Sequence, residues 1–577
     1  MKQIVKKIFL SNAQIKIISL ILGYSFWHIF SQSHVTRIWY EVPISFYKVP
    51  KNIQVEAPEK IKIQLSGKRS DLYNIDVKTL AFHINMQDAS VGNRIFKLTQ
   101  KELFLPDSIR LVRCSPANID IMIKKKQETN MQRNLFGTDG IRGAVGIRPL
   151  THDYIIYLGS AIAAWAQEKY GDSPTILIGH DTRQSCDMIK SALKTGLLLS
   201  QVNLYDAGII PTPAAYVIAK KLKANRSDRF DCAIVISASH NPYQDNGIKI
   251  IDAKTGKLSY IDEETITQIF YNNCKKEACY STLGSDNIFF QAEQKYIEFV
   301  TNHFKKDLLK GLKIVLDCAH GATAQVGPAI FEMLGAQVYL IGSSPNGINI
   351  NEQCGSVHPK ALQREVLLQK ADAGFAFDGD GDRVVAVNAL GQIKDGDDIL
   401  AILHNHPMYQ HEKAIVGTIL TNYGFEKYLE QRGKKLIRTN VGDKFVVQAM
   451  KKQNLLLGGE QSGHIAIRDY LDMGDGIFVA LKVMETLIQT GNFQMKTFEK
   501  YPQLMVNVPI TEKKDLDSGP ISELIASYKQ NVQNGRIVVR YSGTQNLLRV
   551  MVEADTMSVA EKICLNLSNE LQKELST

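Results

Sequence analysis

A serine that follows a short apolar run is the first group in this sequence that could carry out covalent chemistry. Residues 233–236 (AIVI) predict a buried strand, and Ser239 follows them in the polar segment ISASHNP. A hydroxyl exposed on such a turn can act as a covalent carrier if a neighbouring side chain handles its proton. His240 and Lys249 are the nearby candidates for that task. The alternative is a polar loop whose Ser and Asn side chains bond to their own backbone.

Three aspartates separated by glycines form the second candidate site. Asp378, Asp380 and Asp382 lie between two apolar runs, residues 374–377 and 384–387. Glycine lets the backbone curl so that three carboxylates face one point, where their repulsion requires a cation to neutralise it. Oxygen ligands of this kind suit Mg²⁺, with substrate or phosphoryl oxygens completing the coordination shell.

Two other interpretations of this aspartate segment were weighed against a magnesium site. An EF-hand is excluded, because Arg383 stands where that calcium loop needs glycine and Ala389 stands where it needs glutamate. A solvated acidic turn is the other alternative, and the sequence leaves it open.

The glycine-hinged segment GGEQSGH, residues 458–464, brings three polar side chains together. Glu460, Ser462 and His464 could surround a sugar with hydrogen bonds. A simple turn before the following apolar run accounts for the segment equally well.

The segment RYSGTQNLLR, residues 540–549, has the composition of a phosphate clamp. It offers hydroxyls, turn amides and two guanidinium groups, whose planar forks match phosphate oxygens. It lacks the G-K-[ST] of a Walker loop, and an ordinary turn is the alternative. Together the four segments supply a hydroxyl carrier, a divalent metal, a sugar reader and a phosphate anchor, which are the parts needed to move a phosphoryl group on a sugar.

These segments occur in the order typical of one enzyme family. From residue 131 to the C-terminus the chain resembles the α-D-phosphohexomutases, through FGTDGIRG (136–143), SASHNP, DGDGDR, GEQSGH and R-x-SGT. Within that family, NLFGTDGIRG, ISASHNPYQDNGIKI, SPNGININ and CGS are most similar to the phosphoglucosamine mutases. The resemblance implies interconversion of glucosamine 6-phosphate and glucosamine 1-phosphate through a phosphoserine and glucosamine 1,6-bisphosphate, for UDP-N-acetylglucosamine and cell-wall precursor synthesis. A phosphomannomutase or phosphoglucomutase would use the same chemistry on another sugar.

The resemblance also implies a role for each matching residue. Ser239 is the expected phosphoserine, and its phosphoryl oxygen is expected to join the three aspartates around Mg²⁺. Arg142, Lys249 and His464 are expected to assist proton transfer and charge stabilisation. The expected substrate contacts are Glu460 and Ser462 on sugar hydroxyls, and Arg540, Ser542, Gly543, Thr544 and Arg549 on the non-reacting phosphate.

Some positions depart from the usual family pattern. Gln545 and Asn546 replace a usual Glu-Pro pair, and Cys186 replaces a common glycine. Lys444 stands where the family often has arginine, and lysine keeps the charge but loses bidentate geometry. Lys444 is still expected to contribute to substrate binding, with reduced phosphate affinity.

The elements that must position these residues are strands alternating with helices. Apolar runs that precede polar segments alternate with helical patterns, which is typical of α/β layers with largely parallel sheets. The expected fold is a four-domain α/β phosphohexomutase with mixed sheets and a C-terminal α+β domain, preceded by a small all-β domain. The expected boundaries are 1–34 for a basic N-terminus and transmembrane helix, 35–126 for the all-β domain, 127–130 for a linker, and 131–284 (phosphoserine), 285–388 (metal loop), 389–503 (sugar loop) and 504–577 (phosphate) for the mutase domains.

The N-terminal part carries no catalytic pattern. Residues 17–33 contain no Lys, Arg, Asp or Glu, and the stretch 15–33 is expected to anchor the chain in a membrane; a buried helix or an uncleaved signal-like segment is the alternative. Alternation at 61–65 and 119–123 predicts strands.

An apolar helix ending in Trp, a VP-x-S-x-Y strand and a Pro-led strand ending in LSG resemble the YbbR-like domain. That family is membrane-tethered and serves as a regulatory partner of a diadenylate cyclase. A membrane scaffold that regulates such a cyclase is therefore the alternative function of another class. Retention of all five mutase motifs argues against a chain without enzymatic activity.

Composition limits the partners and the compartment. The chain has 577 residues, more than one hydrophobic core usually organises. Its net charge of +9 is mixed with acids and forms no basic stripe with aromatics, so a phosphorylated small molecule is a better partner than nucleic acid. The 8 cysteines form no C-x-x-C pair and are too sparse for a disulfide framework, which favours a reduced, cytosolic compartment. The resemblance also implies a homodimer.

Charge at the N-terminus creates a conflict about location. Lysines precede the apolar segment, so a single span would keep the N-terminus in the cytoplasm and place the mutase outside, away from its substrate. Either the segment does not span, or the topology is inverted, or translation also starts at Met131. We therefore expect the mutase part in the cytoplasm, with the full-length chain anchored in the cell membrane by one N-terminal helix.

Overall fold

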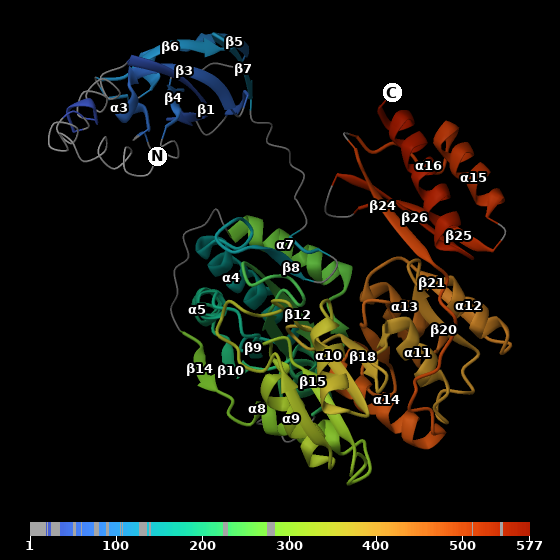
Figure 1. Cartoon of the computed structure of the whole chain (residues 1–577). Coiled ribbons are helices and arrows are strands. Elements are labelled where there is room, and N and C mark those ends of the chain that lie inside the picture. The colour runs from blue at the N-terminus through green and yellow to red at the C-terminus, as the bar shows by residue number, and fades with distance from the viewer. Residues whose placement is uncertain are drawn as a thin grey trace, which may run out of the picture. The chain divides into compact units, whose positions relative to one another are not determined.

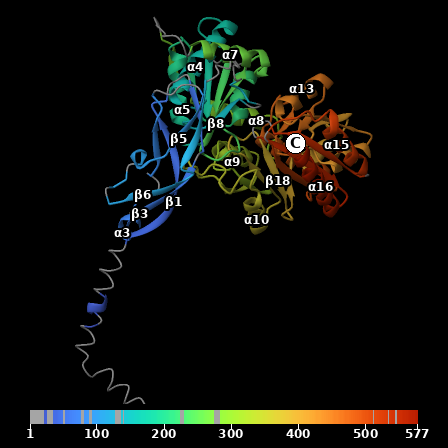
Figure 2. The same ribbon diagram turned by 90° about the horizontal axis from the view of Figure 1, so that it is seen from above.

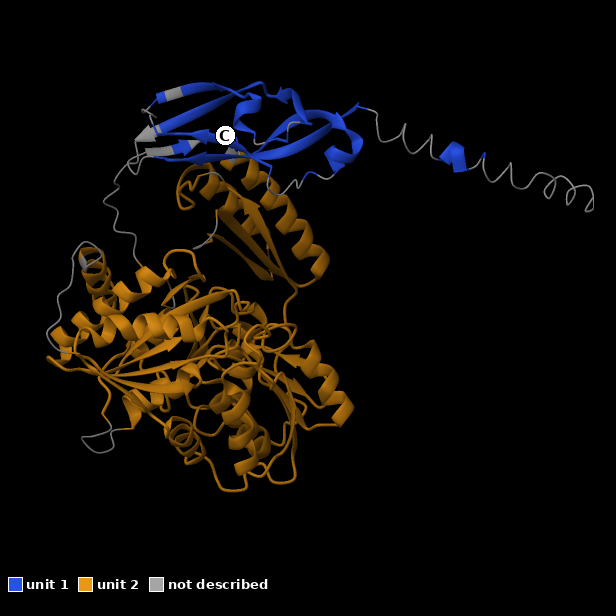
Figure 3. Cartoon of the chain, turned by 90° about the vertical axis from the view of Figure 1, so that its left-hand side faces the viewer, with its two compact units in different colours: residues 1–131 blue, residues 132–577 orange. Residues whose placement is uncertain are grey.

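The chain divides into two compact units, residues 1–131 and 132–577, shown in separate colours in Figure 3. The apolar stretch at 15–33 lies almost entirely outside the described residues, and so does the expected linker at 127–130. Within the described part of the chain, no helix has both the length and the apolar character needed to cross a bilayer. The computed structural model describes residues 19, 21–24, 35–49, 53–58, 60–73, 75, 80–87, 92–103, 105–106, 108–125, 135–137, 140–222, 229–273, 283–510, 512–532, 534–542 and 546–576.

The first unit is built mostly of strands in two sheets, ordered β4-β1-β3-β6 and β2-β7-β5 (Figure 1). Alternate residues such as Ile61 and Ile63 in β3 and Ile119 and Ile121 in β7 are buried in one shared core, as the period-2 pattern predicts. The elements are β1 (Val35–Tyr47), β2 (Ile53–Glu56), β3 (Lys60–Lys68), α3 (Arg69–Tyr73), β4 (Phe82–Asn85), β5 (Gly92–Lys97), η1 (Gln100–Glu102), β6 (Arg110–Ser115) and β7 (Asn118–Lys125).

The second unit begins with a mixed sheet in the order β13-β12-β11-β9-β10-β14, with β8 beside β12. Ile176 and Ile178 of β9 pack against α4, α5 and α7, whereas Leu177 faces the opposite layer with α6 and α8 (Figure 1 and Figure 2). Burial on both faces explains why its strands are continuously apolar. The elements are β8 (Ile141–Ala144), α4 (His152–Tyr170), β9 (Thr175–His180), α5 (Cys186–Leu198), β10 (Asn203–Ile209), α6 (Thr212–Tyr216), η2 (Val217–Lys221), β11 (Cys232–Ile236), β12 (Asp245–Asp252), β13 (Gly256–Lys257), α7 (Tyr260–Asn273) and β14 (Ser285–Ile288).

The next sheet has the order β16-β15-β17-β18-β19. Strand β15 is parallel to β16 and β17, and β17 turns back into the antiparallel β18. The elements are α8 (Ala292–Thr301), β15 (Lys313–Asp317), α9 (Thr323–Met333), β16 (Gln337–Ile341), α10 (Lys360–Gln369), β17 (Ala373–Phe377), β18 (Val384–Asn388) and β19 (Ile393–Lys394).

The third sheet repeats this plan in the order β21-β20-β22-β23. Strand β20 is parallel to β21 and β22, and β22 turns back into the antiparallel β23. The elements are α11 (Gly396–His404), β20 (Ala414–Thr418), α12 (Tyr423–Glu430), β21 (Lys435–Thr439), α13 (Asp443–Gln453), β22 (Leu457–Gly459), β23 (Ile465–Ile467) and α14 (Gly476–Thr490).

The C-terminal sheet is antiparallel, in the order β24-β26-β25, and is covered by two helices (Figure 2). Its elements are β24 (Gln503–Pro509), α15 (Gly519–Asn531), β25 (Gly535–Tyr541), β26 (Leu547–Ala554) and α16 (Met557–Ser576). The expected α/β fold with mixed sheets is therefore confirmed for the second unit. Each of its four sheets also contains an antiparallel hairpin, formed by β11–β12, β17–β18, β22–β23 or β25–β26, and each hairpin connection carries one of the four polar motifs.

Candidate active site

The turn after β11 places Ser239 in an unusual backbone conformation. Ser239 has φ +54°, in the left-handed region that costs free energy for any residue with a side chain. The turn is held by a buried chain of hydrogen bonds: the Ser239 amide donates to Ser237 Oγ at 2.9 Å, and Ser237 Oγ donates to Asp181 Oδ2 at 2.6 Å. Backbone strain of this kind persists only where the surroundings fix it, as they do here.

Arg183 is the main support of this turn, and the sequence analysis missed it. Its fully buried guanidinium donates to the carbonyl oxygens of Ser239 and Asn241, each at 2.9 Å, and also contacts those of Pro242 and Asp245. Asp181 compensates the buried charge, with its carboxylate 2.8 Å from the guanidinium. Two charged residues directly after a continuously apolar strand were the available sequence signal.

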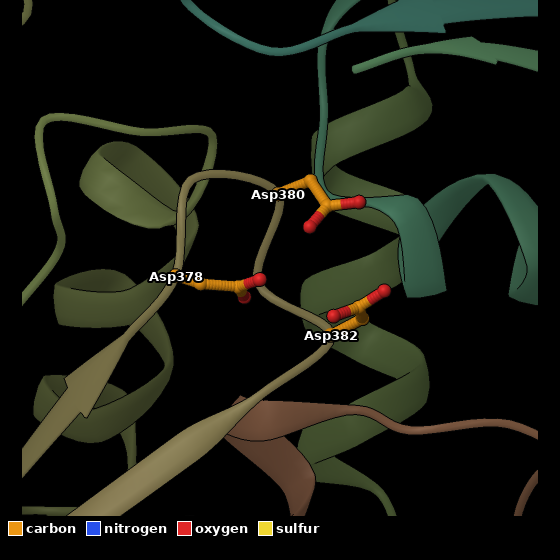
Figure 4. Close-up of side chains that lie close together, drawn as sticks. All are labelled: Asp378, Asp380 and Asp382. Atoms are coloured by element: carbon orange, nitrogen blue, oxygen red, sulfur yellow. The ribbon is translucent and has the colours of Figure 1, made fainter. Parts of the chain in front are cut away.

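The three aspartates of the loop between β17 and β18 point toward one another (Figure 4). Asp378 and Asp380 are fully buried, Asp382 is 3% exposed, and ligand atoms of the three carboxylates lie within 4.8 Å of one another. Gly381 has φ +74°, a conformation that a side chain disfavours. The structure thus brings together the cluster expected from the alternating Asp and Gly.

Hydrogen bonds connect the hydroxyl carrier to this cluster. Ser239 Oγ donates to Asp378 Oδ2 at 2.5 Å. Burial, and then repulsion from the carboxylates of Asp382 and Asp380, raise the pKa of Asp378. Such a cluster favours either a bound proton or a bound cation.

The donor set around Asp380 fits a divalent cation. Its Oδ2 accepts hydrogen bonds from Thr212 Oγ1 at 2.5 Å and from Lys249 Nζ at 2.8 Å. Its Oδ1 is buried without a hydrogen-bond partner among the described residues. Lys249 also lies 3.0 Å from Asp382 Oδ2, and Arg383 Nε lies 3.7 Å from Asp382 Oδ1, so two cationic side chains face three carboxylates. A charge deficit remains, and hard oxygen atoms of this kind are the ligands that Mg²⁺ prefers.

Two cationic side chains and a histidine surround the Ser239 hydroxyl. His240 Nδ1 is 3.3 Å from Ser239 Oγ, and burial, followed by the charges of Arg383 and Arg142, lowers the pKa of His240 to about 3. His240 is therefore neutral at physiological pH. Arg142 lies on β8 and donates to the carbonyl of Ala238 at 3.5 Å, and Arg383 Nε is 3.9 Å from Asp378 Oδ2.

The turn between β22 and β23 carries the expected sugar-binding residues. Glu460 and His464 are buried, and Ser462 is exposed. Glu460 Oε1 accepts a hydrogen bond from the Gly442 amide at 2.9 Å, and His464 Nε2 is 3.3 Å from Asp443 Oδ2.

The same turn is docked onto the metal loop. The amide of Val384, at the start of β18, donates to the carbonyl oxygen of Gly463 at 3.1 Å. The expected sugar reader and the aspartate cluster are therefore held against each other by backbone contacts.

Lys444, which is expected to contribute to substrate binding, lies beside an acidic side chain of the first sheet's layer. Its Nζ is 2.9 Å from Glu263 Oε1 on α7, so its charge already has a partner in the first sheet's layer. The pair borders a pocket with about 540 Å³ of free space, open solvent included. The described residues that line this pocket are Phe136, Gly140, Thr212, Tyr216, Lys249, Ile250, Ile251, Lys257, Leu258, Glu263, Asp382, Lys444 and Met473.

The expected phosphate clamp lies on the C-terminal sheet. Arg540 and Arg549 face each other across β25 and β26, and desolvation together with repulsion from Arg549 lowers the pKa of Arg540. Ser542 is buried, whereas Gly543 and Thr544 lie outside the described residues. No described residue that lines the pocket belongs to this sheet.

A hydroxyl beside a cation-binding carboxylate cluster defines, with this four-sheet fold, an enzyme of phosphoryl transfer. Four family descriptions match in order: phosphoglucomutase/phosphomannomutase alpha/beta/alpha domain I at 133–277, domain II at 294–391, domain III at 395–504, and the C-terminal domain at 505–569. The chain belongs to the phosphoglucomutase/phosphomannomutase family and is an isomerase.

Individual relatives agree with that assignment. The phosphoglucosamine mutase of Chlamydia caviae is 39% identical over 460 residues, which cover 78% of this chain and 98% of that protein. A phosphoglucomutase/phosphomannomutase family protein from Burkholderia thailandensis has a similar fold, with TM-score 0.64 and 21% identity over 77% of this chain and 98% of that one. An Aspergillus fumigatus N-acetylphosphoglucosamine mutase, solved with GlcNAc-6P and magnesium, has TM-score 0.52 and 17% identity, covering 76% and 96%.

Proposed function

We propose that this chain interconverts glucosamine 6-phosphate and glucosamine 1-phosphate through a phosphorylated Ser239. The observation that carries the proposal is the 2.5 Å contact between Ser239 Oγ and Asp378 Oδ2, which puts the carrier hydroxyl at the edge of a cation site. The 39% identity to a phosphoglucosamine mutase supports glucosamine as the sugar.

In the first half-reaction, the bond between phosphorus and Ser239 Oγ breaks while a bond forms from phosphorus to O1 of glucosamine 6-phosphate. The sugar hydroxyl passes its proton to a base in this step, and the departing Ser239 oxygen takes up a proton, so that Ser239 is left as a hydroxyl. Lys249 is paired with two carboxylates, and its ammonium group is proposed to stabilise negative charge. The proposed base is His464, on the turn docked against the metal loop.

In the second half-reaction, glucosamine 1,6-bisphosphate presents its other end. The bond between phosphorus and O6 breaks while Ser239 Oγ takes the phosphoryl group again, and the proton that the Ser239 hydroxyl loses is replaced by one delivered to O6. Asp378, Asp380 and Asp382, with a phosphoserine oxygen, are the proposed holders of Mg²⁺, which when bound would offset charge on the transferred oxygens.

The remaining site residues are proposed to hold the substrate. Glu460 and Ser462 would accept and donate hydrogen bonds with sugar hydroxyls. Arg540 and Arg549, with the hydroxyls and amides of residues 542–544, would bind the phosphate that is not reacting. Arg142 would stabilise the transferred phosphoryl group from the far side of the Ser239 turn.

The test is turnover by the purified full chain, started with a trace of glucosamine 1,6-bisphosphate and followed by ³¹P NMR. We expect glucosamine phosphates to be converted faster than glucose or mannose phosphates. Ser239→Ala should abolish turnover while circular dichroism shows an intact fold, and full activity of that variant would contradict the proposal. Faster conversion of mannose or glucose phosphates would favour the other mutase activities instead.

For the N-terminal unit, we propose on its resemblance alone that residues 35–126 form a YbbR-like domain that binds a diadenylate cyclase. Isolated residues 35–126 should capture such a cyclase in a pulldown, and failure to do so would remove the proposal. Immunoblotting of both ends of the chain after cell fractionation would show whether the segment 15–33 anchors it and whether translation also starts at Met131.

A further inference from the structure

We propose that Asp443 is a positioning residue that holds the His464 imidazole in one orientation for proton transfer, an inference that rests on the proposed function above. The sequence analysis assigned no role to Asp443.

Asp443 lies where a carboxylate is stabilised. It is the first residue of α13, so the positive end of the helix dipole favours its charge. Its side chain is 8% exposed, and Oδ2 lies 3.3 Å from His464 Nε2 and also pairs with Lys257 Nζ. The contact with His464 is one of charge, because Nε2 is buried without a partner in hydrogen-bond geometry among the described residues. Lys257 belongs to β13 of the first sheet, so a residue from another sheet neutralises the carboxylate without displacing the histidine.

Gly474 confines the same Nε2 edge of the His464 ring. A Cβ at that position would lie 2.8 Å from Nε2 and 2.9 Å from Cε1, so only glycine leaves room for the ring. The same Cβ would also collide with the carbonyl oxygen of Asp382. The Nε2 edge of the imidazole therefore meets both the Asp443 carboxylate and the backbone that precedes α14, next to the metal loop.

This arrangement favours one tautomer of the ring. A carboxylate beside Nε2 favours the tautomer that carries its proton there, which leaves the lone pair on Nδ1. A single ring orientation and a single tautomer are what a proton acceptor needs before the substrate binds. Without the carboxylate, the ring could flip or change tautomer.

The groups that face Asp443 come from two sheets. His464 belongs to the third sheet, and Lys257 belongs to the first. The ion pair between Lys444 of α13 and Glu263 of α7 lies beside them. The turn before α13 also holds Glu460, through the hydrogen bond from the Gly442 amide. Asp443 therefore belongs to a segment whose described contacts fix both buried side chains of the GEQSGH motif.

The decisive experiment compares Asp443→Asn, His464→Gln and the double variant with the wild type, using the full chain, Mg²⁺ and glucosamine 6-phosphate. If Asp443 acts through His464, Asp443→Asn should lower kcat by about 10- to 100-fold with little change in KM. When position 464 is already glutamine, Asp443→Asn should cause no further loss of kcat. Additive losses in the double variant, or unchanged kcat in the single one, would overturn the proposal.

Asp472→Asn is the matched control, because Asp472 also accepts a lysine from the first sheet's layer, Lys220 at 3.4 Å, without contacting His464. It should leave kcat within about twofold. A wild type inactive on every hexose phosphate would instead remove the proposed function.

A spectroscopic measurement decides the case if Asp443→Asn fails to fold. In ¹⁵N-histidine-labelled wild type, with His464→Gln used to assign the signal, we expect the His464 ring to be protonated at Nε2. A ring protonated at Nδ1, or a mixture of both tautomers, would overturn the proposal.

Discussion

The hydroxyl of Ser239 lies 2.5 Å from the carboxylate of Asp378, although 139 positions separate the two residues in the chain. The approach depends on a glycine: a Cβ on Gly379 would be 2.7 Å from the Ser239 carbonyl oxygen and 2.9 Å from Asn351 Nδ2. The carrier turn and the metal loop are therefore packed backbone against backbone, as one preassembled site.

Gly379→Ala should separate these two loops. The added methyl group cannot fit without moving the Ser239 turn, so we expect turnover to fall by at least about 100-fold. Gly327→Ala is the control, because its Cβ would make only contacts of 3.9 Å or more inside α9. That control should retain activity, and equal activity of the two variants would contradict the close packing.

Asp380→Asn should weaken Mg²⁺ binding. It removes one of the three anionic ligands, whereas Thr212→Val removes only a hydrogen bond that orients Asp380. We expect the first change to lower the affinity the most and the second to lower it by about 10-fold, as for other residues that orient ligands. Titration calorimetry of the unphosphorylated protein would measure both, and an unchanged affinity in Asp380→Asn would refute the metal assignment.

Arg183→Met should destabilise the protein as well as the site. The change leaves Asp181 as a buried charge without its guanidinium and removes the donors for the carbonyls of the Ser239 turn. Breaking a buried pair from one side typically costs about 3–5 kcal/mol. Chemical denaturation would measure the loss; Lys427→Met, at an exposed ion pair with Glu430, should change the unfolding free energy little. Equal stability of the two variants would contradict the supporting role.

Arg540→Met should weaken substrate binding without destabilising the fold. Arg540 and Arg549 are directly opposed on adjacent strands, and like charges in that arrangement repel. Removing one charge should therefore leave the unfolding free energy of the ligand-free protein unchanged or slightly higher. The KM for glucosamine 6-phosphate should rise by about 10-fold or more, because a charged hydrogen bond to phosphate is lost. A clear loss of stability with an unchanged KM would show that the pair is structural.

Asp475 should make stability depend on pH. Burial raises its pKa from 3.8 to about 6, although Tyr296 and Tyr470 donate hydrogen bonds to it. The folded state therefore binds this proton more tightly than the unfolded state. The contribution to the unfolding free energy must fall as pH rises from 3.8 toward about 6, by up to about 3 kcal/mol in total.

Asp475→Asn removes this titration. Denaturation at several pH values would measure the unfolding free energy of both proteins. Between pH 3.8 and about 6 the wild type should lose stability relative to the variant, and above that range the difference should stay constant. A difference that is constant with pH, or that moves toward the wild type, would contradict the raised pKa.

The sequence predicted the parts of the site whose residues lie close together in the chain, and missed contacts between residues that are distant in the chain. The alternating aspartates and glycines of residues 378–382 predicted a carboxylate cluster, since residues so close in sequence must share one turn. The apolar runs predicted buried strands. Ser239 was recognised because it follows such a run, and Glu460 because it stands in a glycine-hinged polar segment. The hairpin after each of these runs was not predicted, because antiparallel pairing depends on strands that meet only in the folded sheet.

The tertiary structure alone decided which other residues support the site. Arg183, Thr212 and Asp443 contact groups that are 56, 168 and 21 positions away, and Lys444 pairs with Glu263 of the first sheet's layer. Local pattern carries no information on such pairings, because the packing of separate sheets brings the partners together. The sequence by itself therefore determined the chemical groups and their family, and the fold decided which side chains orient them.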